Sequence, residues 1–174
     1  DLLLQSAFDT LETLFRTGTR KTAPPVTRPP ALDRRVGAFV TLYQGGELRG
    51  CIGQVNPAEP LCRLIPELTM SAALDDSRFT HAPLPPTETT VEISLLTPLK
   101  PVADQEQFVL HRHGAYLEQD GCRGLLLPQV AHEHHLNREQ FLRALARKAG
   151  LEWERLRGSH RLSVFRASRF SAPV

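Results

Sequence analysis

The sequence predicts an α+β fold in which helices pack on a mostly antiparallel sheet. Two turn signals carry this prediction, because Gly45-Gly46 and Asp120-Gly121 each separate two short runs of strand-forming residues. Amphipathic stretches with helical spacing stand among these hairpins, without the regular strand and helix alternation of a parallel sheet. We expect one domain over residues 1–174, a length sufficient for a buried core.

Three stretches have the apolar spacing of amphipathic helices. Residues 2–16 form the first. In residues 59–75 the apolar face contains Pro66, so we expect a kinked or divided helix there. The third begins at the N-cap Asn137 and ends at Gly150.

Short runs of alternating apolar residues predict the strands. They lie at residues 36–42, 47–52, 90–96, 113–118, 123–127 and 162–167. The prolines of residues 19–31 fit neither a helix nor a central strand, so we expect a proline-rich connecting arm along the surface.

Composition excludes several classes of protein. Hydrophobic residues are 41% and charged residues 23% of the chain, which is typical of a folded domain and not of a disordered tail. No apolar run approaches the roughly 18 residues of a membrane-spanning helix, and no signal peptide is recognisable, so we expect a cytoplasmic protein. The net charge of +2, with mixed signs, makes nucleic-acid binding the least favoured function, although 18 arginines against 3 lysines keep it open.

The cysteines and histidines do not have the spacing of a metal site. Cys51, Cys62 and Cys122 are odd in number and share no CxxC spacing, which argues against a disulfide framework and a thiolate zinc site. The histidines of residues 132–135 do not form a helical HExxH pattern, since position 136 is leucine. We therefore expect no metal and no cofactor, and we interpret Cys62 and Cys122 as structural.

The strand over residues 47–52 carries the candidate site. Because side chains alternate along a strand, Arg49 and Cys51 share one face, while Leu48 and Ile52 share the other. If the apolar pair faces the core, Cys51 faces a cleft in which the Arg49 guanidinium stabilises a thiolate.

Two glycines, Gly50 and Gly53, remove bulk around this thiol, so a ligand or another backbone segment can come close. The structural alternative is that Cys51 is a small buried residue and that the glycines serve a bulge. Both interpretations stay open on the residues alone.

Three further residues are candidates. His113 stands at the start of a predicted strand, where an imidazole can act as general base toward a thiol. Arg78 follows Asp76 at the end of the second helical stretch, where it either contacts an anionic ligand or forms an ion pair. Glu92 lies on the polar face of its strand, so it either meets solvent or reaches the Arg49 side of the sheet.

The hexapeptide LRGCIG at residues 48–53 resembles the hallmark of the AmmeMemoRadiSam system protein A family, whose eukaryotic relatives are named for a chromosomal region deleted in an Alport-type syndrome. Further matches follow in order along nearly the whole chain, at Ala72-Ala73, Asp76, Arg78-Phe79, residues 92–98, His113-Gly114, residues 124–131 and residues 148–151. The resemblance implies an α+β unit with one larger and one smaller subdomain.

Members of this family look like partners of a Memo-type protein and a radical SAM protein, and the resemblance implies the same partners here. It also supports Cys51, Arg49 and His113 as catalytic residues, with ligand-binding candidates at Gly50, Gly53, Arg78 and Glu92. Two functions remain open. The first is an enzyme subunit with Cys51 as nucleophile or covalent carrier, and the second is a non-catalytic binding or scaffold module for a protein or small ligand.

Overall fold

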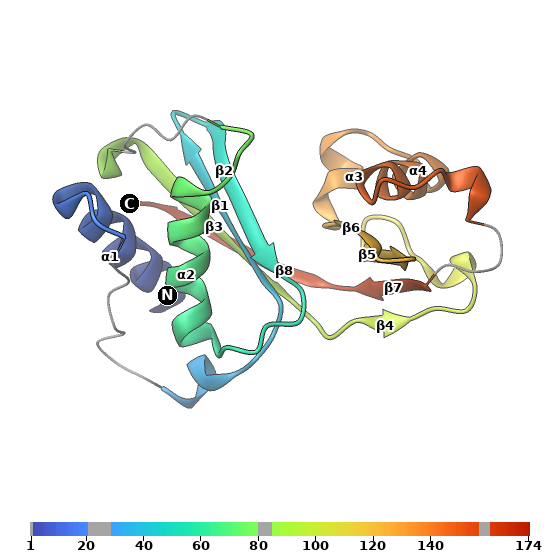
Figure 1. Cartoon of the computed structure of the whole chain (residues 1–174), viewed down its shortest axis with the longest axis horizontal. Coiled ribbons are helices and arrows are strands. Elements are labelled where there is room, and N and C mark those ends of the chain that lie inside the picture. The colour runs from blue at the N-terminus through green and yellow to red at the C-terminus, as the bar shows by residue number, and fades with distance from the viewer. Residues whose placement is uncertain (1, 21–28, 80–84, 157–160) are drawn as a thin grey trace. The chain divides into compact units, whose positions relative to one another are not determined.

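The computed structural model describes residues 2–20, 29–79, 85–156 and 161–174 (Figure 1). Two compact units form: the first unit comprises Asp1–Leu96 and Ser168–Val174, and the second unit comprises Thr97–Ala167. Each contains helices and a four-stranded sheet, so the predicted α+β class with a larger and a smaller subdomain is confirmed.

The first unit is a sheet with two helices on one of its faces (Figure 1). Its elements are α1 (Leu2–Thr17), β1 (Ala38–Gln44), β2 (Glu47–Gln54), α2 (Leu61–Leu74), β3 (Thr89–Leu96) and β8 (Ala167–Pro173), with short 3-10 turns at Pro30–Asp33 and Pro86–Glu88. The strands are ordered β2-β1-β3-β8, which leaves β2 at an edge. Alternate residues of β1 and β3, such as Val40 and Ile93, are fully buried beneath the helices.

The hairpin of β1 and β2 turns where the sequence predicts. Gly45 and Gly46 have φ angles of 57° and 86°, values that a two-residue hairpin turn requires and glycine adopts freely. A register shift follows, because Leu42 pairs with Gly50 but Tyr43 pairs with Leu48. This bulge changes the alternation, so the condition that Leu48 faces the core is not met, and the residue is 39% exposed.

Of the two expectations for Pro66, a division of the helix is wrong, since α2 is one helix over Leu61–Leu74. Proline cannot donate the helical hydrogen bond to the carbonyl of Cys62. Pro66 is nevertheless buried with its neighbours Leu64 and Ile65, which are both fully buried. Burial of this apolar face offsets the lost hydrogen bond.

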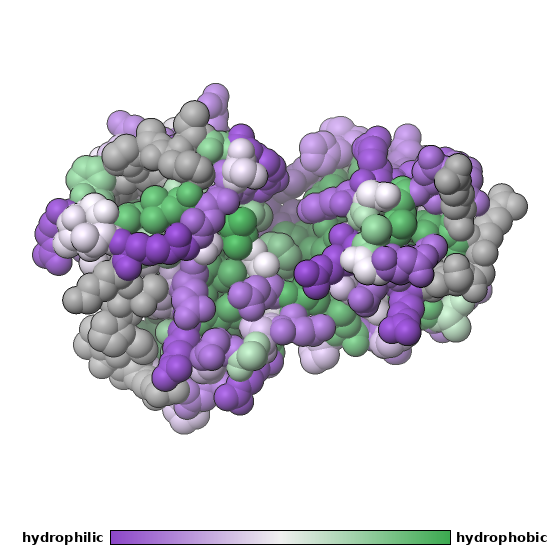
Figure 2. Space-filling view, viewed as in Figure 1, coloured by the Kyte–Doolittle hydropathy of each residue, from purple (hydrophilic) through white to green (hydrophobic). Residues whose placement is uncertain are grey.

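The predicted arm over residues 19–31 falls largely on residues 21–28, which lie outside the described residues. The part that the structure describes continues into the 3-10 turn at Pro30–Asp33. No helix among the described residues is long and apolar enough to cross a bilayer. Figure 2 shows hydrophilic and hydrophobic residues interspersed on the visible face.

The second unit is a sheet ordered β4-β7-β5-β6 with helices packed on it. Its elements are β4 (Lys100–Pro101), β5 (Gly114–Gln119), β6 (Cys122–Leu126), α3 (Gln129–Glu133), α4 (Arg138–Lys148) and β7 (Arg161–Phe165), with 3-10 turns at Gln105–Gln107 and Trp153–Arg155. The predicted third helix is confirmed as α4, which begins with a reciprocal capping box between Asn137 and Gln140. The strand predicted at residues 162–167 is divided, because β7 ends at Phe165 and β8 begins at Ala167 in the other sheet.

The second unit is inserted between β3 and β8 of the first. The chain leaves β3 at Leu96 and returns at the start of β8. The two ends of the inserted segment are hydrogen-bonded to each other. The Thr97 N–H donates to the Arg166 carbonyl, and the Arg166 N–H donates to Thr97 Oγ1, both at 2.9 Å. At the other end of β8, the Val174 N–H donates to the Thr89 carbonyl at 2.8 Å.

We predict that Gly50→Ala destabilises the protein by about 2–3 kcal/mol in urea unfolding. A Cβ atom at Gly50 would lie 1.9 Å from the backbone oxygen of Ala72 in α2, so helix and strand would have to separate. The matched control on the same strand is Leu48→Ala, which should cost less than about 1 kcal/mol. Equal losses in the two variants would contradict close packing at Gly50.

Candidate functional site

The Cys51 side chain lies on the sheet face opposite the helices. Gly50 faces α2, and neighbouring residues of a strand point to opposite faces. Cys51 is half-buried and pairs directly with Thr41 of β1, whose Oγ1 donates a hydrogen bond to Sγ at 3.2 Å. The thiol therefore has a fixed hydrogen-bond donor on the neighbouring strand.

This pairing continues across the sheet as a polar row, which we define as Cys51, Thr41, Glu92 and Arg169. Thr41 lies opposite Glu92 of β3 in the strand register. The Glu92 residue is only 9% exposed, and its carboxylate lies 3.5 Å from the Arg169 guanidinium of β8. Glu92 therefore lies on the Cys51 side of the sheet, beside Arg169.

An ion pair holds the backbone of Cys51 at the outer edge of β2. Asp76 Oδ2 accepts the Cys51 N–H at 2.8 Å, and Arg78 Nη2 donates to the Cys51 carbonyl at 3.3 Å. Arg78 also binds the Asp76 carboxylate through Nε at 2.9 Å and Nη2 at 2.6 Å. The pair thus occupies edge groups that a further strand would otherwise use.

The charges of this pair stabilise each other. The Arg78 side-chain hydrogen bonds lower the pKa of Asp76 to about 2, against the opposing effect of burial and with further help from the N–H groups of Cys51 and Arg78. The hydrogen bonds to Asp76 raise the pKa of Arg78 in turn, and burial opposes this rise. Of the two alternatives for Arg78, the ion pair with Asp76 is therefore present, and it also binds the Cys51 backbone.

Arg49 occupies the bulge of β2, between Leu48, which pairs with Tyr43, and Gly50, which pairs with Leu42. Its Nε donates to Gln44 Oε1 at 3.2 Å. Bulges redirect side chains, so alternation alone does not place the Arg49 guanidinium beside the thiol. The cation that the structure brings to the Cys51 backbone is Arg78.

Both candidate glycines make close packing contacts. The sequence allows either a ligand or another backbone segment to come close to Gly50. In the structure the backbone of Ala72 does so. A Cβ atom at Gly53 would lie 2.2 Å from the ring of Phe39, its partner on β1. The glycines therefore let α2 and an aromatic ring approach β2 closely.

His113 belongs to the second unit, so the proposed pairing with Cys51 stays a prediction. Its Nδ1 accepts the Val109 N–H at 3.1 Å, which places the proton of the neutral ring on Nε2. Burial lowers the pKa of His113, and the charges of Arg112, Arg166 and Lys100 lower it further, against a backbone hydrogen bond to Gln107. The lowered pKa favours the neutral ring, the form that a general base requires.

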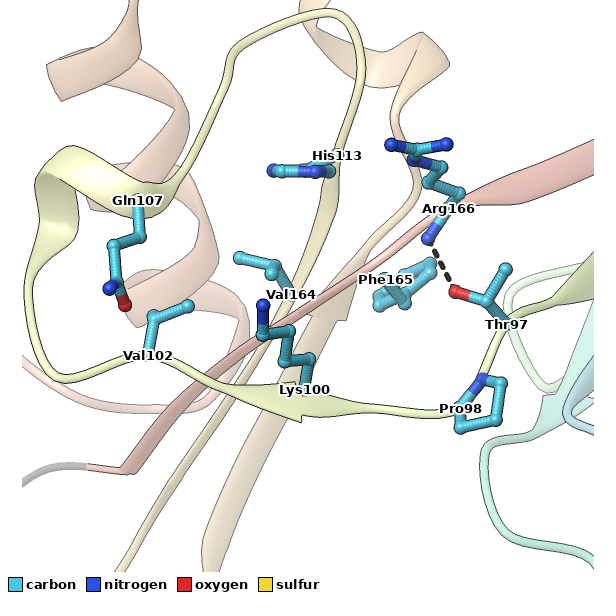
Figure 3. A pocket seen from close by; sticks show the side chains of 9 residues that line it. All are labelled: Thr97, Pro98, Lys100, Val102, Gln107, His113, Val164, Phe165 and Arg166. Carbon is cyan, nitrogen blue, oxygen red and sulfur yellow. Dashed lines mark hydrogen bonds between the residues drawn. The ribbon is translucent and has the colours of Figure 1, made fainter.

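A pocket of about 400 Å³ lies beside His113 (Figure 3). It is lined by Thr97, Pro98, Lys100, Val102, Gln107, His113, Val164, Phe165 and Arg166. Sequence reasoning missed Lys100 and Arg166, because they come together only through the pairing of β4 with β7. A local motif contains no signal for such a pairing.

Cys51, Cys62 and Cys122 are all free thiols. Cys62 is buried in the core, while Cys122 is half-buried in the second unit. Among the residues that the structure describes, no three or more His, Cys, Asp or Glu side chains gather as metal ligands.

Together, the fold and the site define a class of two-unit α+β proteins in which an ion pair holds a cysteine-bearing edge strand. The chain belongs to the AMMECR1 family, whose sequence model matches residues 4–170. This match extends through both units.

Relatives with similar sequences and structures come from archaea. A protein of Methanothermobacter thermautotrophicus is 40% identical over 143 residues, which are 77% of this chain and 73% of the relative. A protein of Thermoplasma acidophilum is 36% identical over 159 residues, which are 87% of this chain and 75% of the relative. The crystal structure of an uncharacterized protein from Pyrococcus horikoshii is similar with a TM-score of 0.88 and 32% identity, covering 97% of this chain and 89% of that one.

We predict that Asp76 makes stability fall in acid. Its folded pKa of about 2 lies below the ordinary value of 3.8, so the stabilisation is complete above about pH 4 and is lost as the pH falls toward 2. Asp76→Asn should lower the free energy of unfolding by about 2 kcal/mol at pH 7, and the gap to the parent protein should shrink between pH 4 and 2. Urea unfolding at stepped pH measures both.

The control for this prediction is Asp75→Asn, which removes an exposed ion pair with Arg20. An exposed pair contributes little, so its variant should differ from the parent by less than about 1 kcal/mol. A gap for Asp76→Asn that stays constant down to pH 2 would contradict the assigned charge state.

Proposed function

We propose that this protein is a thiol-dependent enzyme subunit in which Cys51 is the nucleophile or the covalent carrier. The hydrogen bond from Thr41 Oγ1 to Cys51 Sγ is the observation that carries the proposal. A nucleophile works best when neighbouring groups fix its position and stabilise its charged form. Thr41 supplies the donor, while Asp76 and Arg78 fix the Cys51 backbone.

The other residues have roles that follow from their chemistry. The sulfur electron pair would add to an unsaturated electrophilic carbon of the substrate, and the π electron pair of that carbon would move to its electronegative neighbour. The thiol proton would pass to a general base, the role predicted for His113. Arg49 would stabilise the thiolate or bind an anionic group of the substrate. The Arg78 guanidinium beside β2 is more than half exposed, and Glu92 lies in the polar row between Thr41 and Arg169.

We further propose that the chain belongs to the AmmeMemoRadiSam system protein A subfamily and acts with a Memo-type protein and a radical SAM protein. The support is the LRGCIG sequence at residues 48–53 and the ordered matches that follow it. In such an assembly, Cys51 would carry out one step of a reaction, and a partner would carry out the step before or after it.

A second candidate function is a non-catalytic binding or scaffold module. The observation in its favour is that Gly50 and Gly53 both have packing partners. The motif then has a structural role even without a reaction. Nucleic-acid binding is less favoured, because the net charge is only +2 and a phosphate-backbone site would show steep salt dependence.

We predict that iodoacetamide labels Cys51 roughly tenfold faster than Cys122 at pH 7, as followed by mass spectrometry. Cys122 is a matched control, because both thiols are half-buried. Thr41→Val keeps the side-chain shape but removes the donor, so it should slow labelling of Cys51 by about threefold to tenfold. If Cys51 stays inert even at high pH, the thiol is structural and the binding module is the better function.

Co-purification separates the two candidate functions. For the enzyme subunit, Cys51→Ala should retain the Memo-type and radical SAM partners of the same genome but lose function in the host. For the binding module, Cys51→Ala should retain the two partners and also the function in the host. Failure to retain either partner with the parent protein would contradict the proposed assembly.

A further inference from the structure

The pocket beside His113 combines positive charge with an apolar wall. Lys100 of β4 and Arg166 at the end of β7 both line it, and their side chains extend toward the level of the His113 ring (Figure 3). Among the lining residues in the described part of the chain, none is acidic. The pocket thus holds two cations without a carboxylate in its wall.

These cations are close enough to affect a neighbouring group. The charges of Lys100, Arg166 and Arg112 each lower the pKa of His113, in addition to the larger effect of burial. Like charges that gather in a cavity repel one another, and an anion among them relieves that repulsion. The electrostatics of the pocket therefore favour a negatively charged occupant.

Hydrogen bonds and strand pairing hold the backbone from which the two cationic side chains extend. Arg166 exchanges two hydrogen bonds with Thr97, both at 2.9 Å. Lys100 pairs with Val164 across the β4–β7 ladder. A site on strands needs less ordering when a ligand binds than a site on loose loops.

The remaining wall is apolar. Val102, Val164 and Phe165 contribute apolar side chains to the lining (Figure 3). A volume of about 400 Å³ lies within the range of pockets that bind small organic molecules. This combination fits a ligand with one anionic group and a compact apolar part.

We propose that the second unit binds a small organic anion in this pocket, with its carboxylate or phosphate between Lys100 and Arg166 and its apolar part against Val164 and Phe165. Guanidinium and ammonium groups both bind these anions through charge-assisted hydrogen bonds. The proposal goes beyond the thiol chemistry of Cys51, because every residue it uses belongs to the second unit.

The test is a titration of the full chain with three aromatic probes, followed by NMR of the histidine ring protons. Benzoate and phenyl phosphate carry the two anionic groups, and benzamide is the neutral analogue of benzoate. We expect both anions to shift the His113 signals with saturation, and benzamide to bind at least tenfold more weakly. Tighter binding by one anion identifies the preferred headgroup.

Variants assign the site. Lys100→Gln and Arg166→Gln should each weaken benzoate binding by about tenfold, because each removes one charged donor. The control Arg123→Gln removes an equal charge from β6, the opposite edge of the same sheet, and should leave the affinity unchanged.

The titration of His113 gives an independent readout. The groups that affect its proton are Lys100, Arg112, Arg166, the Val109 N–H and the Gln107 backbone. A bound anion counters the three cations, so benzoate should raise the pKa of His113 and bind more tightly as the pH falls through the range in which His113 gains its proton.

Three results would overturn the proposal. The first is saturation by benzamide at the same concentration as benzoate, and the second is unchanged affinity in both Lys100→Gln and Arg166→Gln. The third is no shift of His113 by either anion at roughly 20 mM, about twentyfold above an expected Kd of about 1 mM. Far-UV circular dichroism of each variant confirms that the fold is retained.

Discussion

The carboxylate of Asp76 is the interaction on which the Cys51 strand depends. A buried carboxylate alone is costly, but this one accepts the Cys51 N–H and three hydrogen bonds from Arg78. It follows directly after α2 and binds the outer edge of β2, so it connects the end of a helix to an edge strand. The position of the thiol is therefore set by the same ion pair that closes this edge of the fold.

The LRGCIG sequence combines packing and chemistry in one strand. Gly50 lets α2 approach, Gly53 accommodates an aromatic ring, and Arg49 stands in a bulge that changes the direction of its neighbour Leu48. These requirements concern the backbone and would apply to a protein without a reaction. Cys51 differs, because its side chain points away from the helices and receives a hydrogen bond from another strand. The glycines thus explain the fold of the motif, and the sulfur carries the functional hypothesis.

Local signals predicted the elements that depend on local chemistry. The Gly45-Gly46 turn and the Asn137 capping box were recognisable because turns and caps have strict residue requirements. Local patterns do not predict that α2 continues through Pro66, because core burial outweighs the lost helical hydrogen bond. They also do not predict that Leu48 faces away from the core, because a bulge reverses the strand alternation. Strand β8 and the pocket beside His113 depend on pairing between distant segments, for which a single sequence has no local pattern.

The insertion of the second unit between β3 and β8 has a consequence for the order of folding during synthesis. The second unit is continuous in sequence, so all of its strands and helices are synthesised before β8 is complete. The first unit begins earlier but lacks an edge strand until β8 emerges. The hydrogen bonds between Thr97 and Arg166 hold the ends of the inserted segment together, which shortens the effective loop that β8 must close. The N-terminal half of this protein is therefore the last to complete its sheet.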